Sequence, residues 1–282
     1  MIAKDLMTVD FKFAEVPGTR QEVLELFKKY GVSGLPVVKK GTRKVLGIVT
    51  RNDMMLKPSE TQLALIMSRN PMTISENTPI EEIAKIMLEK NISYLPVVEG
   101  EEMKGLVTIA DVVWKGLTHL ELKESIKPYV QRKITAVWEQ TPINVAYIIL
   151  RLARTQSLLV LDNSGQLAGI VTDSDIVSKS EVKIEASTSN LHSTGEGAEW
   201  DWESASILYI TKRVLHLPET PISEIMVRNV ITVNEYTSIS DCADKMRVND
   251  IDQMPVLNAE GELIGLIRDV DLLRSLVSKR TD

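Results

Sequence analysis

Threonine and aspartate recur three residues apart at similar places along this chain. The pairs are Thr50 with Asp53, Thr108 with Asp111 and Thr172 with Asp175, and a fourth copy has Arg268 before Asp271. A Thr-x-x-Asp pair can close the first turn of a helix, because each side chain bonds the other residue's backbone N–H. A carboxylate at a helix start can also accept hydrogen bonds from the two hydroxyls of a ribose. The spacing fits both interpretations, a helix cap and a nucleoside-binding site.

Other chemistry is hard to assemble from this sequence. Cys242 is the only cysteine, and the three histidines are far apart in the chain: His119, His192 and His216. An internal disulfide and a cysteine-rich zinc site are therefore excluded. We expect Cys242 to be core packing, because it falls on the apolar stripe of a predicted helix. The carboxylates of "DSD" (Asp173 to Asp175) and "DVD" (Asp269 to Asp271) are two residues apart at helix starts, so they face different ways and predict no metal site.

Composition narrows the class of protein further. The 282 residues are 44% hydrophobic, which is enough apolar material for about two domains. The net charge is −6. We expect no nucleic-acid partner, because no basic cluster is available to neutralise phosphates. The opening "MIAKDLMTVD" lacks the apolar run of a signal peptide, and "INVAYIILRLA" is too short to cross a bilayer. These features predict a cytoplasmic protein without membrane contact.

The phrase around each aspartate ends a longer repeat. "GIVTRND" (47–53), "GLVTIAD" (105–111), "GIVTDSD" (169–175) and "GLIRDVD" (265–271) each follow a short apolar run: "VSGLPVV", "ISYLPVV", "TQSLLVL" and "IDQMPVL". Glycine and asparagine in the segments between them supply the backbone freedom of a turn. Each repeat therefore predicts two strands joined as a hairpin.

A helix is predicted before each strand pair. In "TPIEEIAKIMLEK" the apolar residues Ile80, Ile83, Ala84 and Met87 lie on one helical face, and the other repeats show the same spacing. We expect Thr78 and Thr141 to be N-caps, followed by Pro79 and Pro142 at the first helical position. With a strand before the helix, each unit reads strand, helix, strand, strand, helix.

Four such units account for most of the chain. Their predicted boundaries are 1–60, 61–120, 121–180 and 219–282, with an insertion at 181–218. A sheet covered by helices on one face leaves apolar surface exposed, so we expect the units to pack in pairs. In the insertion, "ASTSNLHSTGEGAEWDW" predicts an exposed loop and "ESASILYITKRVL" a helix. Trp200 and Trp202 fit either a contact that pins the loop or a partner interface.

The combination of an "LPVV" strand with a "GIVT-x-x-D" turn resembles the cystathionine-β-synthase (CBS) domain. The resemblance covers nearly the whole chain outside the insertion. It implies an α/β (α+β) fold of four CBS repeats, paired into two pseudo-twofold tandem (Bateman) modules. It also implies a regulatory function, with adenosine-containing ligands bound in the clefts between paired repeats. Homodimers and an unidentified protein partner are further expectations from the same resemblance.

The resemblance also assigns site residues. It places Asp53, Asp111, Asp175 and Asp271 at the ribose, with Thr50, Thr108, Thr172 and Arg268 beside them and Asn52 and Ser174 near the ligand. Adenine would lie against the partner repeat, at the strand starts and helix starts: Val32, Ser33, Thr78, Ile92, Ser93, Thr141, Gln156, Thr237, Ile251 and Asp252.

Arg268 makes the fourth copy different. Arginine has no acceptor, so it cannot cap the helix as threonine does. It can pair with Asp271 and close the site, or meet a ligand anion; we favour closure or weaker binding. Positive charge near the phrases is thin, mainly Arg51 and Arg268, with Arg20 near the first helix. This favours AMP or S-adenosylmethionine as the ligand over ATP.

The sequence therefore predicts a non-catalytic sensor of an adenosine-containing ligand, without a metal. No paired nucleophile and base and no phosphate-binding glycine motif is present. The alternative is a structural or protein-interaction module without a ligand, acting through the inserted segment. An enzyme acting on a nucleotide is the least favoured interpretation.

Overall fold

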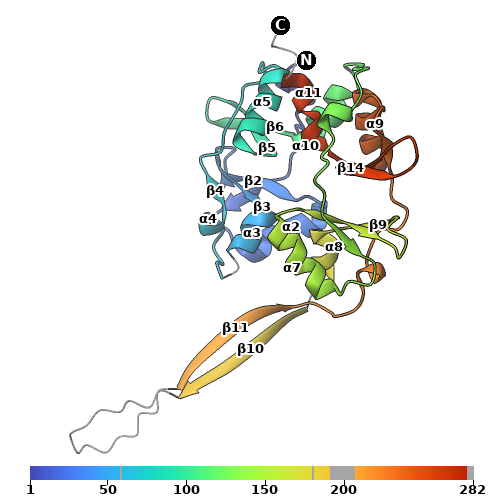
Figure 1. Cartoon of the computed structure of the whole chain (residues 1–282). Helices are drawn as coiled ribbons and strands as arrows, with labels where there is room; N and C mark the ends of the chain where they lie inside the picture. The colour runs from blue at the N-terminus through green and yellow to red at the C-terminus, as the bar shows by residue number, and fades with distance from the viewer. Residues whose placement is uncertain (58, 180, 191–206, 278–282) are drawn as a thin grey trace, which may run out of the picture. The chain divides into compact units, whose positions relative to one another are not determined.

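A computed structural model describes residues 1–57, 59–179, 181–190 and 207–277 (Figure 1). It divides into two compact units, the first formed by Met1–Arg132 and Ile231–Asp282 and the second by Lys133–Val230. The first unit thus holds the first and second repeats and most of the fourth, and the second unit holds most of the third repeat with the insertion. None of the helices in the described ranges combines the length and hydropathy of a bilayer-spanning segment.

The repeats follow the predicted order of elements. The first contains β1 (Ala14–Val16), α2 (Arg20–Tyr30), β2 (Gly34–Lys39), β3 (Val45–Thr50) and α3 (Arg51–Leu56). The second contains α5 (Ile80–Lys90), β5 (Tyr94–Glu99), β6 (Glu102–Thr108), α6 (Ile109–Asp111) and the π-helix η1 (Val112–Leu117). The third contains β7 (Ala136–Trp138), α7 (Ile143–Ala153), β8 (Ser157–Leu161), β9 (Leu167–Thr172) and α8 (Asp173–Ser178). The fourth contains β12 (Val233–Asn234), α9 (Ile239–Asn249), β13 (Gln253–Leu257), β14 (Leu263–Arg268), α10 (Asp269–Leu272) and α11 (Arg274–Val277).

The sheets share one topology. In every repeat the last two strands form an antiparallel hairpin, as predicted. The strand before the helix runs parallel to the first hairpin strand, and in the second repeat a single bridge from Ile74 to Val97 takes its place. A parallel pair needs a crossover, which the 11-residue helix between the two strands supplies.

A short segment that opens one repeat completes the sheet of another. Four such segments contain α1 (Ala3–Leu6), α4 (Leu63–Ile66) with β4 (Ser68–Arg69), and the 3-10 turns η2 (Lys127–Tyr129) and η3 (Ile222–Glu224). Their pairings are Thr8 with Leu106, Ser68 with Ile48, Gln131 with Leu266 and Val227 with Ile170. We call these four pieces the exchanged segments. In each repeat, a segment from a different repeat therefore lies beside the second hairpin strand.

The contact between the exchanged segment and the second hairpin strand requires the glycine that opens the repeated phrase. A Cβ on Gly47 would lie 2.6 Å from the Ser68 carbonyl oxygen and 2.8 Å from the Met67 sulfur. Gly105 and Gly169 face methionine sulfurs of their own exchanged segments at 2.6 Å. Any side chain at these positions would force the segment away from the strand.

The helix predicted in the insertion is wrong. β10 (Glu181–Asn190) and β11 (Ile207–His216) pair antiparallel, with Glu181 opposite His216. The stretch "ILYITKRV" is rich in β-branched and aromatic residues, which favour a strand once a partner strand is available. β10 also includes residues 186–190 of the predicted loop, whereas Trp200 and Trp202 lie outside the described residues.

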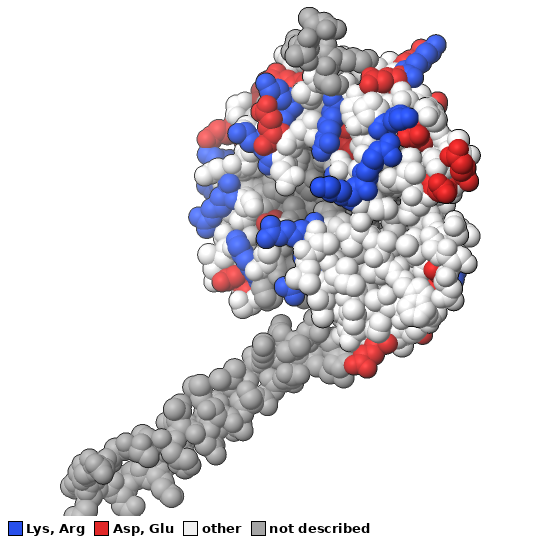
Figure 2. Space-filling model, viewed as in Figure 1, with Lys and Arg blue, Asp and Glu red and all other residues white. Residues whose placement is uncertain are grey.

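The second unit has its own core. α7 buries Ile143, Ala146 and Leu150 against the β8–β9 hairpin, and Ile222 of the exchanged segment joins them. On the face drawn in Figure 2, the surface over α7 and β9 is largely uncharged.

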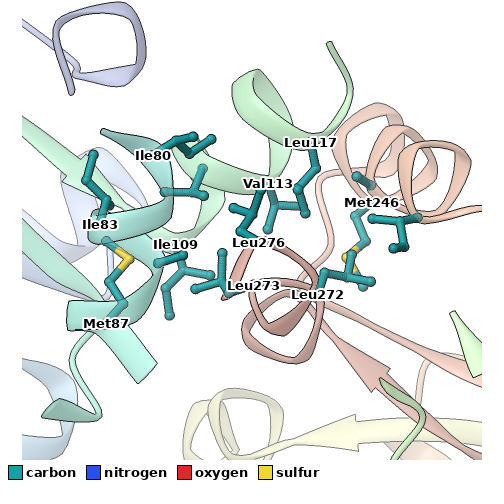
Figure 3. Packing of buried hydrophobic residues seen from close by; sticks show 14 of the residues in the cluster. Ile80, Ile83, Met87, Ile109, Val113, Leu117, Met246, Leu272, Leu273 and Leu276 are labelled. Atoms are coloured by element: carbon teal, nitrogen blue, oxygen red, sulfur yellow. The ribbon is translucent and has the colours of Figure 1, made fainter. Parts of the chain in front are cut away.

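In the first unit, the second and fourth repeats share one core, to which their helices and strands both contribute. Ile80, Ile83 and Met87 of α5 lie in the same cluster as Leu276 of α11 and Met246 of α9 (Figure 3). Cys242 is fully buried in this cluster, which confirms the prediction that it is core packing.

The first and second repeats meet through their sheets instead. Phe11, Met103 and Leu106 form a separate buried cluster, with Val45 and Tyr94 packed against it. A bridge between Lys44 and Glu102 joins the two hairpins, so these repeats pack sheet to sheet as the predicted pair.

Candidate functional site

The Thr-x-x-Asp pairs have the same local geometry in three repeats. Thr50 Oγ1 donates to Asp53 Oδ2 at 2.7 Å, the Thr50 N–H donates to the same oxygen at 2.8 Å, and the Asp53 N–H donates back to Thr50 Oγ1 at 3.2 Å. The boxes at Thr108 and Thr172 repeat these bonds, and each opens a helix. The predicted caps are confirmed at these three positions, and they occupy one oxygen of each carboxylate.

The other carboxylate oxygen distinguishes the repeats. Asp53 Oδ1 accepts a long bond of 3.4 Å from Ser68 Oγ. Asp111 Oδ1 has a Lys115 ion pair at 2.7 Å and a bond from Thr8 at 3.3 Å. Ser68 and Thr8 belong to exchanged segments, so the tertiary contact that completes the sheet also brings a donor to the aspartate.

Arg268 engages both carboxylate oxygens of Asp271 in the fourth copy. Its Nε donates to Asp271 Oδ2 at 2.9 Å and its Nη2 to Oδ1 at 3.0 Å, and Gln131 of the exchanged segment donates to Oδ1 at 2.9 Å. Arg274 adds a weaker ion pair at 3.7 Å, and Asp271 is completely buried. The bond to Asp271 raises the pKa of Arg268. Of the two predicted alternatives for Arg268, pairing with Asp271 is the one present.

A second carboxyl beside this pair has an altered acidity. Burial and the neighbouring Asp252 raise the pKa of Asp269 to about 7. The Asp269 N–H donates to the Asp252 carbonyl at 2.7 Å, which holds the two residues together. The fourth copy therefore combines a closed ion pair with a carboxyl that titrates near neutral pH.

The predicted strand-start residues lie at the helix starts of their own repeats. In each repeat, the first residue of the second helix donates its backbone N–H to the carbonyl oxygen of a strand-start residue, at 2.7–3.3 Å. The accepting residues are Ser33, Ser93, Gln156 and Asp252. Val32, Ile92 and Ile251 instead pack against the cores. Asn52 and Ser174 are exposed on the first turns of α3 and α8.

Tyr94 is a site residue that the sequence did not reveal. Its hydroxyl lies 2.7 Å from Ser33 Oγ, and a Cβ on Gly34 would lie 2.5 Å from its ring. Burial raises the pKa of Tyr94. The ring thus occupies the space between the strand starts of the first two repeats. The sequence patterns also missed four residues that contact the aspartates: Thr8, Ser68, Gln131 and Lys115. For the first three a signal exists, because they end the similar tetrapeptides "DLMT", "LIMS" and "PYVQ".

The predicted N-caps at Thr78 and Thr141 are wrong. Pro79 and Pro142 occupy the N-cap positions, without a side-chain cap, because α5 and α7 begin one residue later than expected. The Thr78 hydroxyl accepts the Ser75 N–H at 3.1 Å instead. In the fourth repeat Ser238, the residue after Thr237, caps α9 by accepting the Asp241 N–H at 3.0 Å.

Few cations remain for an anionic ligand. Arg20 donates to the carbonyls of Met54 and Lys57 at the end of α3, and Arg268 is held by Asp271. Within the residues that the structure describes, no group of three or more His, Cys, Asp or Glu side chains is arranged to hold a metal ion. A cavity of about 200 Å³ lies beside Lys44, and another of about 480 Å³ lies beside Trp114 and is lined in part by Lys115, the partner of Asp111.

Four strand–helix–hairpin repeats, each with an aspartate at a helix start, define an α/β repeat protein. The chain belongs to the CBS-domain family, whose model matches residues 3–60, 63–115, 126–181 and 222–278. The uncharacterised protein MJ1225 of Methanocaldococcus jannaschii is 27% identical over 262 residues, covering 85% of this chain and 86% of the relative.

Two solved structures resemble the whole chain. An uncharacterised conserved protein from Pyrococcus horikoshii is 29% identical with a TM-score of 0.68, covering 98% of this chain and all of the other. The crystal structure of MJ1225 has a TM-score of 0.72 at 22% identity, covering 98% of this chain and 99% of that one, which shows a shared fold. The predicted family and fold class are confirmed.

Proposed function

We propose that this protein is a non-catalytic sensor that binds an adenosine-containing small molecule at the Thr-x-x-Asp boxes. The observation that carries the proposal is the state of Asp53. Its Oδ2 is fixed by two short bonds from Thr50, whereas its Oδ1 has only the 3.4 Å bond from Ser68 among the bonds described. A ribose hydroxyl can replace so long a bond at little cost, because the carboxylate is already oriented.

The four boxes are proposed to bind with unequal strength. Asp111 must give up a 2.7 Å ion pair with Lys115 before it can accept a ribose, and Asp271 must give up the bidentate bond from Arg268. Charge-assisted bonds of this kind are about twice as strong as neutral ones. In the third repeat Val227 stands where Ser68 stands in the first and supplies no polar atom. We expect the first box to bind most readily in the first unit, and the fourth to stay closed.

AMP and S-adenosylmethionine are the favoured ligands. A triphosphate needs several cations, and Arg20 and Arg268 near the boxes are held by protein oxygens. S-adenosylmethionine carries its own positive charge, which suits the acidic "DSD" sequence of the third repeat.

Cys242 gives no support to a nucleophilic reaction. Burial raises the pKa of Cys242 to about 12, so the thiolate that could act as a nucleophile does not form near neutral pH.

Calorimetry and thermal-shift measurements with AMP, S-adenosylmethionine and ATP test the proposal. We expect Asp53→Ala to weaken binding by at least about tenfold, since a charged hydrogen-bond partner is lost. Asp241→Ala is the matched control, because Asp241 forms a Ser-x-x-Asp cap with Ser238 outside the repeated phrase. Unchanged binding in Asp53→Ala, or an equal loss in both variants, would refute the site. Binding of ATP alone would refute only the ligand preference.

A further inference from the structure

We propose that the outer face of α7 is a contact surface for a second copy of this chain, with the two α7 helices antiparallel. Three apolar side chains of α7 are exposed at spacings of three and four: Val145 is 41%, Ile148 55% and Leu152 80% exposed. Residues at this spacing lie on one face of a helix, so they form a continuous outer stripe.

The other repeats supply an internal comparison. The four long helices have 11 residues each, and the outer stripe takes the third, sixth and tenth positions of α7. At these positions the other helices have Glu22, Glu25 and Lys29; Glu82, Lys85 and Glu89; and Asp241, Asp244 and Val248. A fully apolar outer stripe is therefore particular to the third repeat and is no requirement of the fold.

The outer stripe is separate from the core of the second unit. The inner face of α7 is formed by Ile143, Ala146 and Leu150, each at most 6% exposed. α7 is thus apolar on two faces, and a helix that is apolar on nearly all sides is normally covered by protein.

The charges at the two ends of α7 favour a second copy as the partner. Arg151 and Arg154 stand at its C-terminal end, α7 contains no acidic residue, and Glu139 precedes its N-terminal end. An antiparallel pair centred on Ile148 brings the arginine end of each copy to the glutamate end of the other. It also opposes the two helix dipoles, and it gives the twofold, self-complementary contact common in homodimers.

The area of the outer stripe limits the affinity of the proposed dimer. Three side chains on a helix cover a few hundred Å², against about 800 Å² per partner in a stable complex. The dimer is therefore weak and reversible, with a Kd of roughly micromolar or higher.

Sedimentation velocity over a concentration series tests this surface. The wild-type chain should shift from monomer to dimer as its concentration rises, and Ile148→Glu with Leu152→Glu should weaken the dimer at least about tenfold. Lys85→Glu is the control, because Lys85 holds the position in α5 that Ile148 holds in α7. It should dimerise like the wild type. A wild type that stays monomeric, or a dimer indifferent to the double change, would overturn the proposal.

A cysteine probe tests the geometry without depending on a destabilising change. In the antiparallel pair Ile148 faces itself across the twofold axis, so Ile148→Cys should form a disulfide-linked dimer under mild oxidation. Lys85→Cys should not, and the native Cys242 is buried and does not compete. Equal crosslinking of the two variants, or none in either, contradicts the arrangement.

Discussion

Arg268 and Asp271 form a two-bond ion pair across the first turn of α10, at 2.9 and 3.0 Å. In the other three repeats a threonine at the position of Arg268 holds the aspartate by its hydroxyl and its N–H. The same helix start is thus stabilised in two chemically different ways: the threonine cap bonds one carboxylate oxygen, whereas the arginine engages both.

Replacing Arg268 separates the cap from the ion pair. Arg268→Ala should lower the free energy of unfolding by about 1–3 kcal/mol, because the buried Asp271 loses its main partner while Arg268 itself is half exposed. Arg268→Thr should lose less, since threonine rebuilds the box of the other repeats. Chemical denaturation measures both values. Equal losses would mean that the threonine hydroxyl does not cap α10.

Replacing Gly47, the glycine that opens the first phrase, is predicted to destabilise the fold for steric reasons. Gly47→Ala should cost about 2–4 kcal/mol of unfolding free energy, because the new Cβ meets the Ser68 carbonyl. Gly41→Ala is the control: its site has a positive φ of 73° but open space, so it should cost only about 1 kcal/mol. Thermal unfolding compares the two, and an equal or smaller loss in Gly47→Ala would contradict the close contact.

Asp269 predicts a pH dependence of stability. Its pKa is about 7 in the folded protein and near 4 when unfolded, so between these values the folded state binds the extra proton. The free energy of unfolding then falls as the pH rises from about 4 to 7. Asp269→Asn should remove this fall and exceed the wild type by roughly 1–3 kcal/mol at pH 8, with a smaller gain at pH 4.5. A gain independent of pH would show that Asp269 titrates normally.

The Ser33–Tyr94 bond should couple the first two repeats. Ser33→Ala and Tyr94→Phe each remove the 2.7 Å bond, at a cost of about 0.5–1.5 kcal/mol. The double variant should lose little more than either single one, because the same bond is removed only once. Additive losses in the double-mutant cycle would mean that the two hydroxyls act independently.

Local sequence patterns predicted most elements correctly. The stripe of Ile80, Ile83 and Met87 predicts α5, and Thr50 with Asp53 predicts the start of α3, because caps and helical faces depend on residues three or four apart. The same local logic failed at Thr78, where the helix starts one residue later, and in the insertion, where the pairing of β10 with β11 overrides a helical pattern.

The sequence by itself determined the number of repeats, the order of their elements and which aspartates stand at helix starts, since all of these are encoded within a few neighbouring residues. Only the tertiary structure decided what each aspartate meets. Ser68, Thr8 and Gln131 reach Asp53, Asp111 and Asp271 because exchanged segments lie beside strands distant from them in the sequence. Such contacts depend on how the repeats pack together, and no spacing within one repeat specifies them.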